Sequence, residues 1–241
     1  MSRMKIAVMQ PYFFPYIGYY QLISAVDYFV VADNYQFSEG WINRNRILTS
    51  GNIQYLTVNL EKDSHKVEIN KRKISNEFSR EKAINKIHHS YRRSVFYNEF
   101  IGELISNINF QEKNLLKYLM NSIRNISNLL EIKANFINAS ELEIQPSMSP
   151  EDKIISICKK LNGNCYINLP GGKNLYSPSR FRGEGVDLEF IKPNLIKYDQ
   201  KNEKTYAQCN FIENLSIIDL IFNVGIDNAR KLHLPSFEVL K

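Results

Sequence analysis

Two adjacent histidines, His88 and His89, are the side chains of this sequence best suited to general acid–base chemistry. Imidazole changes its protonation state near neutral pH, so a small shift in its pKa makes it a usable general base. The pair lies in a stretch with helical spacing, where neighbouring side chains point about 100° apart. At most one of the two can therefore face a site comfortably, and both could equally be ordinary surface histidines.

A second cluster, Arg44, Asn45 and Arg46, could bind an anion. Two guanidinium groups in a polar segment beside Trp41 can fork onto a phosphate or a carboxylate. The same arginines could instead pair with nearby acids in a solvated loop. The Gly-Gly-Lys at 171–173 could cradle a phosphate with its backbone amides, but a turn after a strand explains it equally well.

Other common catalytic motifs are missing from the sequence. Its three cysteines, Cys158, Cys165 and Cys209, lack metal-ligand spacing, and its four histidines do not cluster with them. This predicts structural thiols in a reducing compartment and no metal site. Neither a Gly-x-Ser-x-Gly nucleophile elbow nor a Gly-x-Gly-x-x-Gly after the first strand is present.

The composition is that of a globular protein with a sizeable core. Hydrophobic residues make up 44% of the 241 residues, and the net charge is +6. This charge suits a polyanion or a phosphorylated small molecule, but heavy use of Lys explains it as well. No apolar run approaches the roughly 18 residues that cross a bilayer, and no leader segment is evident. We expect a cytoplasmic protein with no membrane span.

Segments typical of strands alternate with segments typical of helices. The expected strands are 5–9, 28–33, 53–61, 134–140, 165–169 and 186–191, and the expected helices are 17–26, 78–108 in two parts, 111–132, 150–163 and 216–225. Residues 34–52 and 170–185 are expected to be polar or glycine-containing connections. Continuous apolar strands are typical of a parallel sheet covered on both faces. The pattern predicts a three-layer α/β fold with a mostly parallel Rossmann-like sheet, in one domain over 1–241 with a helical insertion at about 77–132.

Ligands of such sheets bind beyond the carboxyl ends of the strands. The residues at these ends, and in the turn after the strand at 165–169, are therefore the candidate binding residues: Gln10, Tyr12, Asp33, Gln36, Gly172 and Tyr176. Asp219 and Asn223 lie four residues apart on an apolar helix and share a face. Polar groups there must be hydrogen-bonded or line a cavity.

The stretch 10-QPYFFPYIGYYQLI-23 carries six aromatic rings where the chain passes from the first strand into the first helix. The rings could form part of the core or the floor of a pocket. We expect Phe13, Phe14 and Tyr20 to be core residues, whereas Gln10 and Tyr12 are better placed to reach a pocket.

Several blocks, in their order along the chain, resemble the WbqC-like family of bacterial proteins. They are 10-QPYFFPYIGYY-20, 30-VVADNYQF-37, 42-INRNRI-47, 56-LTVNL-60, 88-HHSYRRSVFY-97, 166-YINLPGGKNLY-176, 198-YDQ-200 and 216-SIIDLIFNVG-225. Tyr16 stands where the family commonly has tryptophan, and the match around the histidines is looser. The resemblance implies a place in the synthesis of surface polysaccharides such as O-antigens, where an amino sugar on a nucleotide is often acylated.

A weaker resemblance links 16-YIGY-19 to the His-x-Gly-His turn of nucleotidyltransferases and related amide-forming ligases. Gly18 is retained, but tyrosines replace both phosphate-binding histidines. This replacement disfavours ATP-dependent adenylylation and suits stacking on a base or a sugar ring.

The leading hypothesis is an acyl- or aminoacyltransferase that forms an amide on a nucleotide-linked amino sugar. His88, His89 or Asp33 would act as the base, while Gln10 and the Arg44–Arg46 block would hold the diphosphate or the oxyanion. Tyr12 or Trp41 would stack on a ring. We expect no bound cofactor; the donor is either a coenzyme A thioester or an aminoacyl-tRNA. The alternatives are a non-catalytic sugar-nucleotide-binding protein and an ATP-dependent amide ligase. The sequence does not reveal the oligomeric state.

Overall fold

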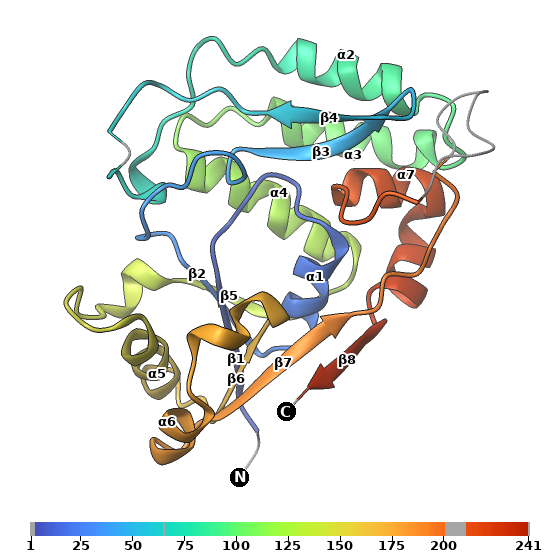
Figure 1. Ribbon diagram of the computed structural model, residues 1–241. Helices are drawn as coiled ribbons and strands as arrows, with labels where there is room; N and C mark the ends of the chain where they lie inside the picture. The colour runs from blue at the N-terminus through green and yellow to red at the C-terminus, as the bar shows by residue number, and fades with distance from the viewer. Residues whose placement is uncertain (1–2, 65, 201–210, 241) are drawn as a thin grey trace.

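The computed structural model, which describes residues 3–64, 66–200 and 211–240, is built on one six-stranded sheet (Figure 1). The strand order is β5-β2-β1-β6-β7-β8, with β1 (Lys5–Met9), β2 (Tyr28–Val31), β5 (Asn135–Asn138), β6 (Cys165–Asn168), β7 (Asp187–Pro193) and β8 (Phe237–Leu240). All neighbours are parallel except β8, which joins the edge antiparallel to β7. The prediction of a mostly parallel, Rossmann-like α/β fold is confirmed.

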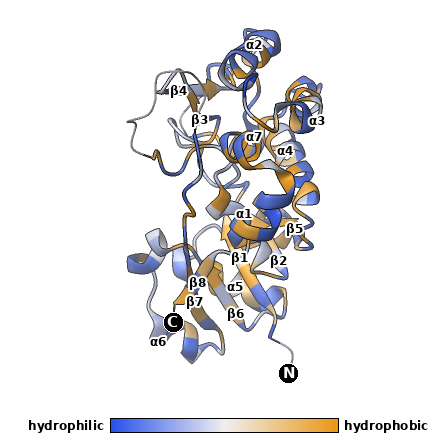
Figure 2. Cartoon of the chain, turned by 90° about the vertical axis from the view of Figure 1, so that its right-hand side faces the viewer, coloured by the Kyte–Doolittle hydropathy of each residue, from blue (hydrophilic) through white to orange (hydrophobic). Residues whose placement is uncertain are grey.

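Alternate side chains of the central strands enter two different hydrophobic clusters, one on each face of the sheet. From β1, Ile6 and Val8 pack with helices α5 (Pro150–Lys160) and α6 (Pro178–Gly183). Ala7 points the other way, into a larger cluster with α1 (Ile17–Ser24), α4 (Leu115–Leu129) and α7 (Ile217–Asn228). Strand β1 is therefore apolar on both faces, and Figure 2 shows orange, hydrophobic residues in this central part of the sheet.

The predicted helical region between β4 (Asn52–Thr57) and β5 contains α2 (Arg80–Tyr91), α3 (Tyr97–Asn109) and α4. The side chains of Ser79 and Asn114 accept hydrogen bonds from backbone amides in the first turns of α2 and α4, and so fix where these helices begin. The assignment of the whole chain to one domain stays a prediction.

The prediction that residues 34–52 form a polar connection is wrong. Strand β3 (Arg44–Thr49) lies in that segment and pairs antiparallel with β4 (Asn52–Thr57), so the strand expected at 53–61 belongs to a separate hairpin. Ser50 and Gly51 form its two-residue turn with φ of 47° and 74°. Positive φ at both positions is what a tight hairpin turn requires.

Three further segments of the chain differ from the prediction. The connection at 170–185 contains a 3-10 helix (Pro170–Leu175) and then α6, which is anchored by the fully buried Phe181. Helix α7 continues past Gly225 to Asn228, with a kink at that glycine. Strand β8 was not predicted, because a four-residue edge strand with two exposed positions has little hydrophobic pattern.

Both described cysteines are free and buried. Burial raises the pKa of the Cys158 thiol and of the Cys165 thiol to about 12. Cys209 lies outside the described residues. No group of metal-binding side chains was found in the described part of the chain. In the same residues, none of the helices combines the length and the apolar character needed to cross a membrane.

Candidate functional site

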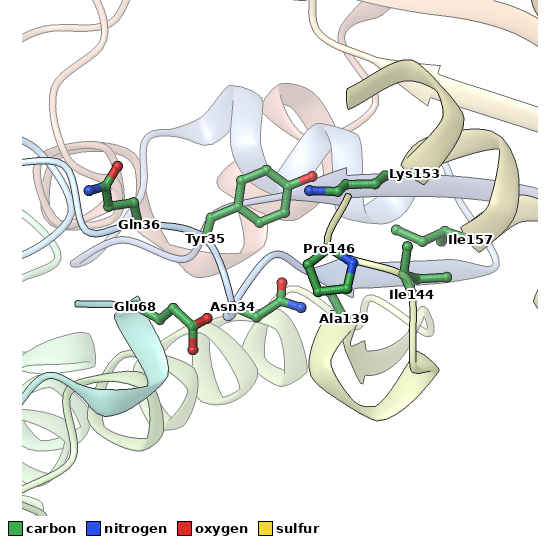
Figure 3. Close-up of a pocket in the computed structure, with 9 residues that line it drawn as sticks. All are labelled: Asn34, Tyr35, Gln36, Glu68, Ala139, Ile144, Pro146, Lys153 and Ile157. Carbon is green, nitrogen blue, oxygen red and sulfur yellow. The ribbon is translucent and has the colours of Figure 1, made fainter. Parts of the chain in front are cut away.

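A cavity of about 230 Å³ opens beyond the carboxyl ends of β2 and β5 (Figure 3). Its lining combines an apolar side with several polar groups; the residues are Asn34, Tyr35, Gln36, Glu68, Ala139, Ile144, Pro146, Lys153 and Ile157. This is the edge of the sheet where parallel α/β folds bind their ligands. A cavity with an apolar side and a few convergent polar groups is typical of a small-molecule site.

Backbone hydrogen bonds hold the two chain segments on one side of the cavity together. The segment after β2 forms an isolated antiparallel bridge between Gln36 and Glu68. The Phe37 amide donates to the carbonyl of Val67 at 3.0 Å, and the Ile69 amide donates to the carbonyl of Tyr35 at 3.0 Å. Glu68 is therefore fixed beside Tyr35 and Gln36 although it lies over thirty residues later in the chain.

The cavity offers three functional groups of different chemistry. Figure 3 shows the Lys153 ammonium pointing toward the Tyr35 hydroxyl, with Glu68 and Asn34 on the same lining. Burial is the main cause that raises the pKa of Tyr35, so its hydroxyl is neutral and can donate a hydrogen bond. Glu68 pairs with the exposed Lys71 at 2.8 Å and supplies a carboxylate. The site thus contains an anion, a cation and a neutral donor.

Asp33 lies beside the cavity and is almost fully buried. Its carboxylate accepts hydrogen bonds from the Ser140 amide at 2.9 Å, the Ser140 hydroxyl at 2.6 Å and the Asn70 side-chain amide at 3.1 Å. These bonds connect the end of β2 to the segment after β5 and to the segment after Glu68. The geometry gives Asp33 the role of holding the cavity wall in place.

Packing decides the role of the aromatic turn. Phe13, Phe14 and Tyr20 are at most 1% exposed, which confirms that they are core residues. Tyr12 is half-buried: its hydroxyl accepts the Tyr16 amide at 3.0 Å, and its ring meets Trp41 edge-on with centroids 5.5 Å apart.

The carbonyl of Gln10 accepts the Tyr19 hydroxyl at 3.1 Å. Gln10, Tyr12 and Trp41 do not line the cavity.

The side chains of the Arg44–Arg46 block donate hydrogen bonds to backbone carbonyls of three different segments. Arg44 donates to the Gly40 carbonyl and stacks over the Tyr55 ring, 4.4 Å from its centroid. Asn45 donates to the Phe14 carbonyl at 2.6 Å. Arg46 donates to the carbonyls of residues 213 and 214 at 3.1 and 2.9 Å. These bonds are all to the protein backbone, and none of the three residues reaches the cavity.

The other candidates are spread over the molecule. His88 and His89 are exposed on α2, and the Nδ1 atom of His88 lies 2.8 Å from the Tyr97 hydroxyl.

Gly172 is buried against Asn168, whose side-chain nitrogen would lie 2.5 Å from an added Cβ, and Tyr176 packs edge-on against Phe181. Of all the candidates, the structure brings only Gln36 into the cavity lining, with Asp33 directly behind it.

Sequence reasoning missed Asn34, Tyr35, Glu68 and Lys153. The first two lie inside the 30-VVADNYQF-37 block, so their position after a strand was a usable signal. Glu68 and Lys153 had no local signal, because they reach the cavity from segments far along the chain.

A second buried polar group surrounds Asp219 on α7. Its carboxylate accepts the Tyr91 hydroxyl at 2.9 Å and the Tyr198 hydroxyl at 2.7 Å. Asn223 donates to the Asp219 backbone carbonyl at 2.8 Å. Both residues are therefore hydrogen-bonded, which is one of the two possibilities expected for polar side chains on this apolar helix. Burial raises the pKa of the Asp219 carboxyl to about 6, although the two tyrosine hydrogen bonds oppose this shift.

The shifted pKa of Asp219 makes stability depend on pH. The folded-state value of about 6 lies above the value near 3.9 expected for the unfolded chain, so the folded protein binds the proton more tightly. The contribution of the protonated Asp219 carboxyl to the free energy of unfolding is complete below about pH 4 and is lost as the pH rises through about 6. Above that range, the hydrogen bonds from Tyr91 and Tyr198 stabilise the buried, ionised carboxylate of Asp219.

We expect Tyr198→Phe to reduce the free energy of unfolding by about 2 kcal/mol at pH 7.5, since it removes a hydrogen bond to a charged group. At pH 5.0, where Asp219 is mostly protonated, the loss should be about 1 kcal/mol. The matched control is Tyr118→Phe, because the Tyr118 hydroxyl donates to the neutral carbonyl of Ile108 at 2.9 Å. Its loss should be the same at both pH values. Urea unfolding at the two pH values measures the loss for each variant. Equal losses for Tyr198→Phe at pH 5.0 and pH 7.5 would contradict the expectation.

Comparison with known proteins assigns the chain to a family. The chain belongs to the WbqC-like protein family, whose model matches residues 10–231. It is also similar to "Uncharacterized protein Rv1507c" of Mycobacterium tuberculosis (strain ATCC 25618 / H37Rv), with 25% identity over 227 residues, covering 92% of this chain and 95% of that protein. No solved structure matches the chain.

Proposed function

We propose that this member of the WbqC-like protein family transfers an acyl or aminoacyl group onto the amine of a nucleotide-linked sugar, as a step in making a surface polysaccharide. The observation that carries the proposal is the cavity beyond β2 and β5, whose lining includes Glu68, Tyr35 and Lys153. A sugar offers an apolar ring face and polar edges, and this cavity has both kinds of lining. The resemblance to a family associated with polysaccharide synthesis supports the choice of substrate.

The reaction needs a base, an oxyanion donor and an anchor. The sugar ammonium must lose a proton before its nitrogen can attack the acyl carbon, and the Glu68 carboxylate would accept that proton. The new bond joins this nitrogen to the acyl carbon, and the thioester or ester bond of the donor breaks. The neutral Tyr35 hydroxyl and the Lys153 ammonium would stabilise the oxyanion that forms between these two events. The nitrogen loses a second proton as the intermediate collapses to the amide; the leaving thiolate or alkoxide takes up one of the two protons, and the other passes to solvent.

These roles replace those expected from the sequence. Glu68 takes the place of His88, His89 and Asp33, because the histidines lie outside the cavity and the Asp33 oxygens already accept three hydrogen bonds. The donor stays open between a coenzyme A thioester and an aminoacyl-tRNA.

The test is an assay for amide formation. The purified protein is incubated with nucleotide-linked amino sugars and, in separate reactions, with acyl-coenzyme A thioesters or aminoacyl-tRNA, and the products are analysed by mass spectrometry. We expect a product whose mass equals that of the amino-sugar nucleotide plus the acyl group minus one hydrogen. Binding of amino-sugar nucleotides without any such product would overturn the proposal.

One observation favours a second candidate function, a sugar-nucleotide-binding protein without catalysis. Among the residues that the structure describes, the cavity lining contains no histidine, cysteine or serine. A binding protein would hold an amino-sugar nucleotide with similar affinity before and after Glu68→Gln, and calorimetric titration would show it.

A further inference from the structure

Next to the cavity lies a second, more open groove of about 440 Å³. The groove is lined by Phe37, Glu39, Gly40, Asn43, Arg44, Thr57, Leu60, Glu61, Lys62, Asp63 and Arg72. The bridge between Gln36 and Glu68 separates the two spaces, since Gln36 and Glu68 line the cavity and the adjacent Phe37 lines the groove. A ligand that crosses this bridge would contact both.

Arg72 is the unusual residue of this groove, because its charge is buried and lacks a counter-charge. Arg72 is only 6% exposed, and no carboxylate of the described residues forms an ion pair with it. Its Nε has no hydrogen-bond partner, and its terminal nitrogens make long contacts of 3.4 Å with the carbonyls of Glu61 and Ser64. Its guanidinium lies 4.7 Å from the centroid of the Phe37 ring. Burying an unpaired charge is costly unless an anion compensates it.

We propose that the groove at Arg72 is a phosphate subsite. A guanidinium has five N–H donors in a planar fork that matches the oxygens of a phosphate, and here only two donors are used, both in long contacts. The carboxylates of Glu39, Glu61 and Asp63 also line the groove, but all three residues are exposed. Solvent and salt screen these exposed charges more strongly than the buried charge of Arg72.

The subsite deepens the function proposed above and rests on it for the identity of the natural ligand. A nucleotide-linked sugar carries its phosphates next to the sugar. With the sugar in the cavity at Glu68, the phosphates would cross the Gln36–Glu68 bridge and reach Arg72. Three residues separate Glu68 from Arg72, and they form the 3-10 helix Ile69–Lys71, which holds both in place.

Inorganic pyrophosphate tests the subsite independently of any transfer reaction. We expect it to bind the wild-type protein, and Arg72→Gln to weaken binding by about tenfold to a hundredfold, as for the loss of charged hydrogen bonds. The matched control is Arg80→Gln. Arg80 also stacks on aromatic rings and has an unpartnered Nε, but it does not line the groove. Equal pyrophosphate affinity in Arg72→Gln and wild type, or no binding to the wild type, would overturn the proposal.

A second pair of variants covers the case in which Arg72→Gln does not fold. Thr57 lines the groove from β4 and is partly exposed. Thr57→Glu places a negative charge in the groove and should weaken pyrophosphate binding more than Thr57→Gln, which introduces a side chain of the same size without the charge. Pyrophosphate binding that responds to Arg72 and Thr57, without amide formation in the assay above, would keep the subsite and reject the transferase. Identical pyrophosphate affinity in the two Thr57 variants would reject the subsite.

Discussion

Glu68→Gln is expected to lower the turnover number for amide formation by about 10² to 10⁴, the usual contribution of a general base. Glutamine keeps the shape and the hydrogen-bonding capacity of the side chain but cannot accept the proton of the sugar ammonium. The variant also loses the ion pair with Lys71, but Lys71 is 68% exposed, so this pair contributes little to stability. Steady-state kinetics with the amino-sugar nucleotide measure the effect, and we expect the KM for that substrate to change much less than the turnover number.

The control for this prediction is Glu77→Gln. Glu77 is an exposed carboxylate outside the cavity, so its replacement removes the same charge from the protein without touching the site. Its turnover number should equal that of the wild type. If Glu68→Gln also retained full turnover, Glu68 would not be the base.

Gly225→Ala should destabilise the protein by about 2 to 5 kcal/mol, from backbone strain and overpacking together. Gly225 interrupts α7 with φ 81° and ψ 163°, a conformation that only glycine adopts without strain. An added Cβ would also lie 2.8 Å from the nearest carbon of the Phe96 ring. Both the backbone kink and the close contact with Phe96 therefore require glycine at position 225. Urea unfolding with a thermal scan measures the loss.

Gly102→Ala is the matched control, because Gly102 lies inside α3 and an added Cβ there would have no neighbour within 4 Å. Alanine is the better helix former, so this variant should gain about 0.5 to 1 kcal/mol. A loss of stability for Gly225→Ala together with a gain for Gly102→Ala would show that the effect at Gly225 comes from its backbone conformation and its contact with Phe96. A small or absent loss at Gly225 would mean that α7 can straighten.

The same reasoning explains how much of the fold the sequence determined by itself. The apolar runs at 5–9, 28–33 and 165–169 predicted strands covered on both faces, and Ile6, Ala7 and Val8 do alternate between two clusters. The helices of the middle region were readable because the spacing of their apolar residues is a local property. The buried state of Phe13, Phe14 and Tyr20 was also expected, since large rings in a strand-to-helix turn have few other places to go.

The tertiary structure alone decided where the site lies. Arg44, Asn45 and Arg46 have the composition of an anion site, but each donates to a backbone carbonyl and none lines the cavity; of the three, only Arg44 lines the neighbouring groove. Glu68 and Lys153 have no distinctive neighbours in sequence, yet packing of α5 and the Gln36–Glu68 bridge brings both to one cavity. Local sequence sets periodicity and turn chemistry, whereas a site depends on contacts between distant segments. That is why the sequence determined the layers of this protein and only the folded chain determined its cavity.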